Sequence, residues 1–270
     1  MPTGLKLSGE EVSPWSLADS NRIICLSIME SCDIFYEDYV RGYVKERQAG
    51  NVMIEINIVL ILEIIGTVAF AFSGCMVANT KKMDIFGVWV LGTVTAVGGG
   101  AVRDVLLGLF PPHMFRNGIY VAVATATVAV WILMVAARGE LTDKLFAKLT
   151  RIMDFSDALG LGIFAVIGSQ TAIRTGYGDN WFLVVFVGVL TGVGGGLLRD
   201  VMADSTPMIF CKRIYAIAAL IGSLIYVVLY QRIPETAAIL LGTAAVFVIR
   251  LLAGKYRWDL PVFVLEREEK

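Results

Sequence analysis

Long apolar runs, separated by short polar breaks, follow one another along the chain from Ile54 onward. The hydrocarbon core of a bilayer is about 30 Å thick, so a membrane helix needs about 20 consecutive, mostly apolar residues. The runs therefore predict seven membrane helices, and because they are continuous rather than alternating they exclude a membrane β-barrel. The predicted spans are Ile54–Ala78, Ile85–Phe110, Gly118–Ala137, Asp157–Ile173, Trp181–Met202, Ile214–Tyr230 and Thr236–Leu252.

Composition agrees with an integral membrane protein. Of the 270 residues, 57% are hydrophobic and only 17% are charged, with a mean hydropathy of +0.72, whereas soluble domains carry about 25% charged residues. The lipid bilayer is therefore an expected partner, and a formal net charge of −1 gives no reason to expect nucleic acid. Four cysteines without a CxxC spacing and a single histidine, His113, make a disulfide framework or a metal site unexpected.

Residues 1–52 differ from the rest of the chain. Their only apolar patch, Ile23–Met29, is too short to span a bilayer and lacks the basic start and apolar core of a secretory signal. Two interpretations are open: a flexible or weakly structured N-terminal extension, or a non-native leader in front of a natural start at Met53.

The charges of the connecting segments predict the orientation in the membrane. With the N-terminus outside, the outer connections carry only Arg116, Arg174 and Arg232. Basic residues are enriched on the cytoplasmic side of membrane proteins, so the bias favours an outside N-terminus and a cytoplasmic C-terminus, although the basic residues at 41–47 argue mildly the other way. The cytoplasmic connections would carry Lys81, Lys82, Arg138, Lys144, Lys148, Arg151, Lys212, Arg213, Lys255 and Arg257.

One short phrase occurs twice, as GGGAVRD at residues 98–104 and as GGGLLRD at residues 194–200. Upstream residues match as well, so spans one to three repeat as spans four to six. A unit of three crossings ends on the side opposite its start, and the second copy must therefore be inserted upside down relative to the first. The further matches are Gly66, Phe70, Ala71, Gly74, Gly92 and Thr95 with Gly160, Phe164, Ala165, Gly168, Gly188 and Thr191.

The predicted fold is an all-α membrane protein whose seven transmembrane helices form two inverted three-helix repeats plus one extra helix. Inverted repeats are common in transport proteins, which place their site at the repeat interface near the membrane midplane. The expected organisation after residues 1–52 is a first repeat at 53–139, a second repeat at 152–232, a seventh helix at 233–258 and a C-terminal tail at 259–270.

The glycine triplets allow two interpretations. Small residues let membrane helices pack closely, whereas unwound backbone at membrane depth is tolerated where it lines a watery cavity. Because an Arg-Asp pair follows each triplet, we expect the second and fifth spans to break or kink there and to face a polar pathway. The pore or kink residues are Gly98, Gly99, Gly100, Gly194, Gly195 and Gly196, and the weakly specified lining candidates are Ser73, Thr95, Ser169 and Thr191.

Each Arg-Asp pair is costly at membrane depth and needs a partner. Adjacent residues on a helix do not face each other, so pseudo-twofold symmetry predicts that Arg103 pairs with Asp200 and that Arg199 pairs with Asp104. Each arginine could instead bind carbonyls freed at the opposite triplet. The alternative is that both pairs cap helix ends at the membrane surface.

Two other acids lie in the predicted spans. Asp157 begins the fourth span, where helix capping and a functional role are equally open. Glu63 lies deep enough in the first span to need a partner.

Enzyme motifs are missing from the sequence. The segment Gly192–Leu197 departs from GxGxxG at its last position, and no strand precedes it. The chain also has no GxSxG, HExxH or Walker phosphate loop. We therefore expect neither catalysis nor a cofactor.

The doubled GGGxxRD phrase and the stretches Gly66–Gly74 and Asp157–Gly162 resemble the prokaryotic trimeric intracellular cation channel (TRIC) family, whose members also carry the label of glycine transporter domain. The resemblance covers about residues 53–258. It implies a homotrimer in a prokaryotic cell membrane, with a pore for monovalent cations, mainly potassium, in each subunit. It also implies that the triplets at 98–100 and 194–196 kink the second and fifth helices around that pore.

Three functions follow from these patterns. A passive cation channel is the first, provided that the arginines are paired with acids. A secondary transporter of glycine or another small solute is the second, because inverted repeats and broken helices also serve alternating access. A structural or scaffolding membrane protein is the third, in which the glycines serve packing and the charges cap helix ends.

Overall fold

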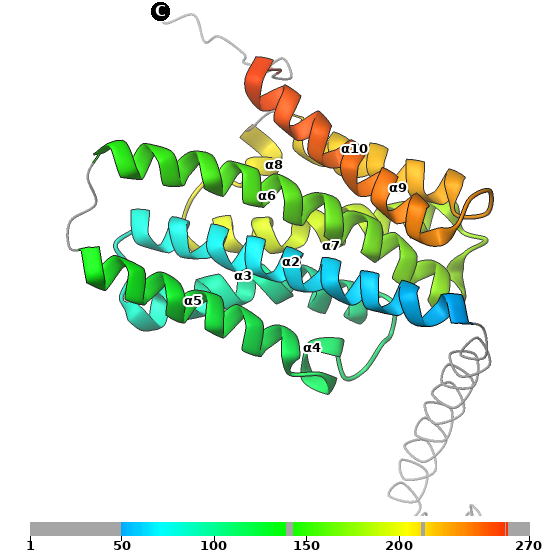
Figure 1. Cartoon of the computed structure of the whole chain (residues 1–270), viewed down its shortest axis with the longest axis horizontal. Helices are drawn as coiled ribbons and strands as arrows, with labels where there is room; N and C mark the ends of the chain where they lie inside the picture. The colour runs from blue at the N-terminus through cyan, green and yellow to red at the C-terminus, as the bar shows by residue number, and fades with distance from the viewer. Residues whose placement is uncertain (1–49, 139–142, 212–213, 257, 259–270) are drawn as a thin grey trace, which may run out of the picture. The chain divides into compact units, whose positions relative to one another are not determined.

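A computed structural model describes residues 50–138, 143–211, 214–256 and 258, and the interpretations of residues 1–49 and 259–270 lie outside this part. Every regular element within the described residues is helical (Figure 1). The elements are α2 (Gly50–Thr80), α3 (Ile85–Leu106), α4 (His113–Arg116), α5 (Ile119–Arg138), α6 (Asp143–Ala172), the π-helical turn η2 (Ile173–Tyr177), α7 (Trp181–Met202), α8 (Met208–Cys211), α9 (Tyr215–Leu229) and α10 (Glu235–Tyr256).

Six of these helices are long and apolar enough to cross a membrane: α2, α3, α5, α6, α7 and α10. The predicted sixth span is the shorter apolar helix α9, so each of the seven predicted spans corresponds to a helix. The all-α membrane fold is thereby confirmed. Asp157 is not at a helix start, because α6 begins at Asp143; the N-cap interpretation of Asp157 is wrong.

The helix α6 lies at the centre of the fold. In the most apolar 18-residue stretch of α6, 67% of the residues are buried, compared with 22% in the corresponding stretch of α5. Helix α5 therefore lies at the periphery. Helices α7, α9 and α10 all pack on α6, and α3 packs on α7 and α5. Figure 1 shows α9 and α10 side by side next to α6, on the side away from α5.

The two glycine-rich helices begin in the same way. The Asp84 carboxylate accepts a hydrogen bond from the backbone N–H of Gly87 at 2.7 Å, and the Asn180 side chain accepts one from Leu183 at 3.0 Å. Both contacts are N-caps, which satisfy donors that the first helical turn leaves free. Each helix then continues as α-helix through its glycine triplet, so a break there is wrong, while a kink at the triplets stays a prediction.

Close backbone contact between α3 and α7 explains how an uninterrupted helix can carry three glycines. A Cβ atom added at Gly99 would lie closer than 3.0 Å to the Thr191 carbonyl oxygen, and one added at Gly195 would lie equally close to that of Thr95. The two contacts are reciprocal, as expected from a duplicated unit. Small residues at such crossings let membrane helices approach through their backbones.

The direction of these contacts shows that the repeats are inverted. Thr95 lies against Gly195, whereas Gly99, one turn later in α3, lies against Thr191, one turn earlier in α7. The corresponding helices α3 and α7 therefore cross antiparallel. The first helices of the repeats do the same: Gly160 of α6 contacts Phe70 of α2, and Gly66 contacts Phe164.

The helix crossing yields a stability prediction. In Gly99→Ala the new methyl group would meet the Thr191 carbonyl, a backbone atom that cannot rotate away, and we expect a loss of about 1–3 kcal/mol in stability. The matched control is Gly100→Ala, whose methyl group would meet only the flexible Arg103 side chain at 3.9 Å. Thermal unfolding of the purified protein in detergent measures both, and equal melting of the two variants would contradict the close crossing.

Candidate functional site

A charged cluster lies at the end of each glycine-rich helix. In the first, the Arg103 guanidinium binds the Asp104 carboxylate through Nε at 2.8 Å and through a terminal nitrogen at 2.7 Å. In the second, Arg199 Nε binds the Asp200 carboxylate at 2.8 Å. The predicted pairing across the repeats, Arg103 with Asp200 and Arg199 with Asp104, is therefore wrong, because each arginine pairs with its own neighbour.

The second oxygen of each aspartate explains this pairing. Asp104 Oδ2 accepts a hydrogen bond from the backbone N–H of His113 at 2.6 Å, and Asp200 Oδ2 accepts one from Met208 at 2.8 Å. His113 and Met208 are the first residues of the short helices α4 and α8. Each carboxylate is thus fixed beyond its own helix end, and the long arginine side chain follows the helix to reach it. The Cβ atoms of adjacent helix residues point apart, but the arginine side chain is long enough for its guanidinium to reach the carboxylate of the next residue.

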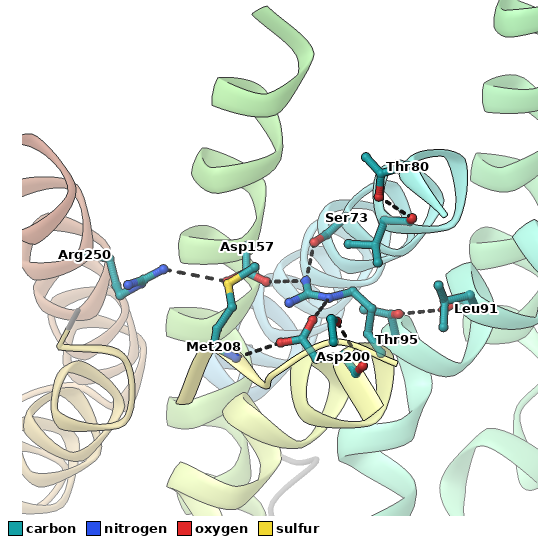
Figure 2. Close-up of polar contacts among 11 residues, drawn as sticks. Ser73, Thr80, Leu91, Thr95, Asp157, Asp200, Met208 and Arg250 are labelled. Carbon is teal, nitrogen blue, oxygen red and sulfur yellow. Dashed lines mark hydrogen bonds and ion pairs between the residues drawn. The ribbon is translucent and has the colours of Figure 1, made fainter. Parts of the chain in front are cut away.

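The second cluster is fully enclosed. Arg199 is 0% exposed, and its NH1 nitrogen binds Asp157 Oδ1 at 2.7 Å and also donates to the Ser73 hydroxyl. The partners of Arg199 come from α2, α6 and α7, and Figure 2 shows three of them, Ser73, Asp157 and Asp200, turned toward one another. Such a charge is tolerated at membrane depth because it is paired and hydrogen-bonded. Arg199 therefore ties together both repeats.

A second arginine approaches the same cluster from α10. The Arg250 terminal nitrogen lies 3.9 Å from Asp157 Oδ2, and its guanidinium carbon lies 4.6 Å from the centre of the Tyr215 ring (Figure 2 shows the Arg250–Asp157 contact). Arg250 was not singled out by sequence reasoning. It is the one charged residue of the predicted span Thr236–Leu252, and this is the signal that could have found it, since a charge within a membrane span needs a partner.

The first cluster, in contrast, borders a cavity of about 40 Å³. This volume is enough for a few water molecules, since one water needs about 10–15 Å³ by the same kind of measure. Glu63 faces this cavity and accepts a hydrogen bond from the Tyr120 hydroxyl at 2.5 Å, so the expected partner of Glu63 is Tyr120. The lining residues are Glu63, Thr67, Ala96, Val97, Gly100, Ala101, Arg103, Asp104, His113, Met114, Tyr120 and Phe164.

Glu63 and Asp157 occupy equivalent positions of the two repeats. Glu63 lies three residues before Gly66, and Asp157 lies three residues before the matching Gly160. Each cluster therefore contains an arginine, its neighbouring aspartate and an acid from the first helix of the repeat. This equal spacing is present in the sequence. The predicted fourth span began at Asp157, however, so Asp157 was interpreted as a helix-start residue and its equivalence to Glu63 was missed.

The three glycines of each triplet have different surroundings: some pack against the other helix, and others lie beside a charged cluster. Gly99 and Gly195 form the helix crossing, while Gly100 lines the cavity. A Cβ atom at Gly196 would lie 2.9 Å from the Tyr215 hydroxyl, beside the second cluster. The packing interpretation thus applies to the middle glycines, while a pathway role for the third glycines stays a prediction. Gly98 and Gly194 complete the contact, next to Leu198 and Gly99 respectively.

The four lining candidates lie elsewhere than the cavity wall. Thr95 and Thr191 each donate to the carbonyl one turn earlier, Leu91 and Val187, at 2.6 Å. Ser169 bonds to the Ala165 and Val184 carbonyls, and Ser73 binds Arg199. All four are buried between helices, and their role in lining a pathway stays a prediction.

The fold and the paired clusters define a multi-pass membrane protein built from inverted three-helix repeats. A family model described as glycine transporter matches residues 60–136 and again residues 154–231. The chain belongs to this family.

Relatives of similar length come from several bacteria. A UPF0126 membrane protein of Vibrio cholerae is 33% identical over 243 residues, covering 90% of this chain and 96% of the relative. The UPF0126 inner membrane protein YadS of Escherichia coli K12 is 38% identical over 207 residues, covering 76% and 96%. These relatives, together with the six apolar helices, place the chain among multi-pass proteins of the bacterial inner membrane.

Solved structures of TRIC channels share the fold. A TRIC cation channel described for its conductance is 36% identical, with a TM-score of 0.68 over 77% of this chain and 98% of that chain. The TRIC trimeric intracellular cation channel orthologue from Rhodobacter sphaeroides is 32% identical, with a TM-score of 0.66 over 74% and 98%. The resemblance to the prokaryotic TRIC family that the sequence motifs indicated is confirmed.

The contrast between the two clusters predicts unequal effects of equivalent substitutions. Arg199→Gln leaves the buried Asp200 carboxylate without its cation and Asp157 with only the more distant Arg250, and we expect a loss of about 3–5 kcal/mol in stability. Arg103→Gln affects one carboxylate beside a cavity that water can enter, so its thermal midpoint should fall much less. Fluorescence-detected size exclusion after heating compares the two, and a larger loss in Arg103→Gln would refute the assignment of the enclosed cluster.

Proposed function

We propose that the protein is a membrane channel for monovalent cations, mainly potassium, with a pore in each subunit of a homotrimer. The single observation that carries this proposal is the cavity beside the first cluster, whose described lining residues include two carboxylates, Glu63 and Asp104, and one guanidinium, that of Arg103. A carboxylate without a compensating cation favours a permeant cation over an anion. The fold shared with TRIC cation channels supports the same function.

Glu63 is the group that would contact the cation. The Arg103 guanidinium is already bound to Asp104, which answers the objection that arginines are unsuitable in a cation pathway. The Glu63 carboxylate has a hydroxyl, not a cation, as its partner and keeps acceptor capacity toward the cavity. In this proposal Tyr120 holds Glu63 in place and Gly100 brings the backbone of α3 close to the ion.

The pathway would continue between α3 and α7 toward the second cluster. The close approach of Gly99 and Gly195 leaves no room between the crossing backbones, so passage requires these helices to shift relative to each other. The structure then corresponds to a closed channel. Loop charges support an outside N-terminus and a cytoplasmic C-terminus, and potassium and the trimer are implied by the family resemblance. Nothing in this mechanism requires catalysis or a cofactor.

A secondary transporter of glycine or another small solute is the second candidate. It is favoured by one specific contrast: the first cluster borders a cavity, while the equivalent cluster of the inverted copy is enclosed. Alternating access needs this kind of asymmetry between two equivalent halves. The family model that matches the chain is described as a glycine transporter.

Reconstitution of the purified protein in lipid bilayers separates the candidates. Unitary potassium currents are expected for the channel, whereas saturable glycine uptake into proteoliposomes without such currents would replace it by the transporter. Failure of both assays in folded protein would favour a structural role.

The cavity gives a prediction for conduction. Glu63→Gln keeps the shape of the side chain and its contact with Tyr120 but removes the charge, so potassium conductance should fall roughly threefold or more at low salt. The effect should shrink at 1 M salt, where screening is strong. The matched control is Asp179→Asn, which removes an exposed acid that does not line the cavity. Equal conductance of the Glu63→Gln variant and the wild type at low salt would exclude Glu63 from the pathway.

A further inference from the structure

The two equivalent acids meet different surroundings because helix α10 lies outside the two repeats and packs on α6 and α9 of the second one. Glu63, in the first repeat, faces a cavity and a tyrosine hydroxyl. Asp157, in the second repeat, is fully buried and has an arginine on each side, Arg199 from its own repeat and Arg250 from α10. Helix α10 lies outside the repeats, and the described residues that line the cavity beside Glu63 include no counterpart of Arg250.

The two arginines are bound to Asp157 in different ways. Arg199 makes a direct hydrogen bond of 2.7 Å to Oδ1. Arg250 lies 3.9 Å from Oδ2, which is within the range of an ion pair but too long for a hydrogen bond. Within the described residues, neither Asp157 Oδ2 nor Arg250 Nε has a hydrogen-bond partner, although both atoms are buried. Arg250 therefore compensates the charge of Asp157 without a hydrogen bond between the two side chains.

This geometry differs from that of a structural ion pair. Buried pairs that hold a fold are hydrogen-bonded on both sides, and arginine usually binds a carboxylate in a bidentate manner. The guanidinium of Arg250 instead rests over the face of the Tyr215 ring, at 4.6 Å. A cation–π contact of this kind remains favourable when the guanidinium moves away from the carboxylate. In the structure Arg250 makes both contacts at once, and the contact with Tyr215 holds the guanidinium without a hydrogen bond to Asp157.

We propose that Asp157 is a second cation site of the pathway and that Arg250 is a tethered cation that occupies it in the closed state. A permeant monovalent cation and the Arg250 guanidinium compete for Asp157 Oδ2. When Arg250 moves away from Asp157 while its guanidinium stays over the Tyr215 ring, Oδ1 keeps its bond to Arg199 and Oδ2 becomes available to a cation from the pathway. The inference rests on the proposed channel function and names the residue that regulates it.

Arg250→Gln is the central test, with the full-length protein reconstituted in planar bilayers. The substitution removes the tethered charge, and we expect the open probability in potassium to rise about fivefold or more. Arg250→Lys keeps a cation and should stay close to the wild type. Arg232→Gln, which removes an exposed arginine, is the control for surface charge.

A double variant tests whether Arg250 acts through Asp157. In an Asp157→Asn background the second site is absent, so Arg250→Gln should cause no further increase in open probability. A second readout does not depend on conduction: potassium, compared with the bulky cation N-methyl-D-glucamine, should raise the thermal midpoint of Arg250→Gln more than that of the wild type. Binding of the cation to the vacated carboxylate is the cause of this shift.

The outcomes are distinct. Unchanged gating in Arg250→Gln, or the same increase with and without Asp157, overturns the tethered-cation proposal while the channel function stands. Loss of the folded peak in both Arg250→Gln and Arg250→Lys would show a structural ion pair and also overturns it. Absence of unitary currents in the wild type refutes the channel function, and the potassium-dependent thermal shift then decides alone whether Asp157 binds a cation.

Discussion

A charge at membrane depth must be neutralised by a partner inside the protein, and this requirement governs the structure around Arg199. Its guanidinium is fully enclosed, and its bonds run to α2, α6 and α7. Because the guanidinium is fully buried, each of these helices must keep its position for the charge to remain compensated. The first repeat meets the same requirement more loosely, since Arg103 has one acidic partner and a cavity beside it. One sequence phrase thereby produces an enclosed cluster in one half and a cluster beside a cavity in the other.

The glycine triplets connect this electrostatic constraint to packing. The middle glycines permit the backbone contact between α3 and α7, and that contact brings the two Arg-Asp pairs to the interface of the repeats. The third glycines leave space where the charged clusters need it, beside the cavity in one repeat and beside Tyr215 in the other. Packing and site are therefore properties of the same three positions. A helix broken at the triplet would lose the contact that holds the clusters in place.

The sequence was sufficient for the membrane helices, the inverted repeats and the importance of the doubled phrase, because hydrophobic run length and internal matches determine them directly. It was insufficient for the partners of the arginines. The backbone donors at His113 and Met208, which hold Asp104 and Asp200, lie in short helices that leave no periodic signal. Asp157 was misplaced because the polar residues before it concealed the first turns of α6. Arg250 was missed because its partner comes from another part of the chain.

The reciprocal crossing of α3 and α7 has a consequence for how this protein can be altered. In both halves the obstacle facing the middle glycine is a peptide oxygen, that of Thr191 or that of Thr95, rather than a side chain. No change of residue type at those threonines would make room for a methyl group, because every amino acid carries the same carbonyl. Second-site suppressors of a Gly99 or Gly195 substitution must therefore lie at positions where a change displaces a whole helix. A genetic screen for such suppressors would identify the residues that set the distance between α3 and α7.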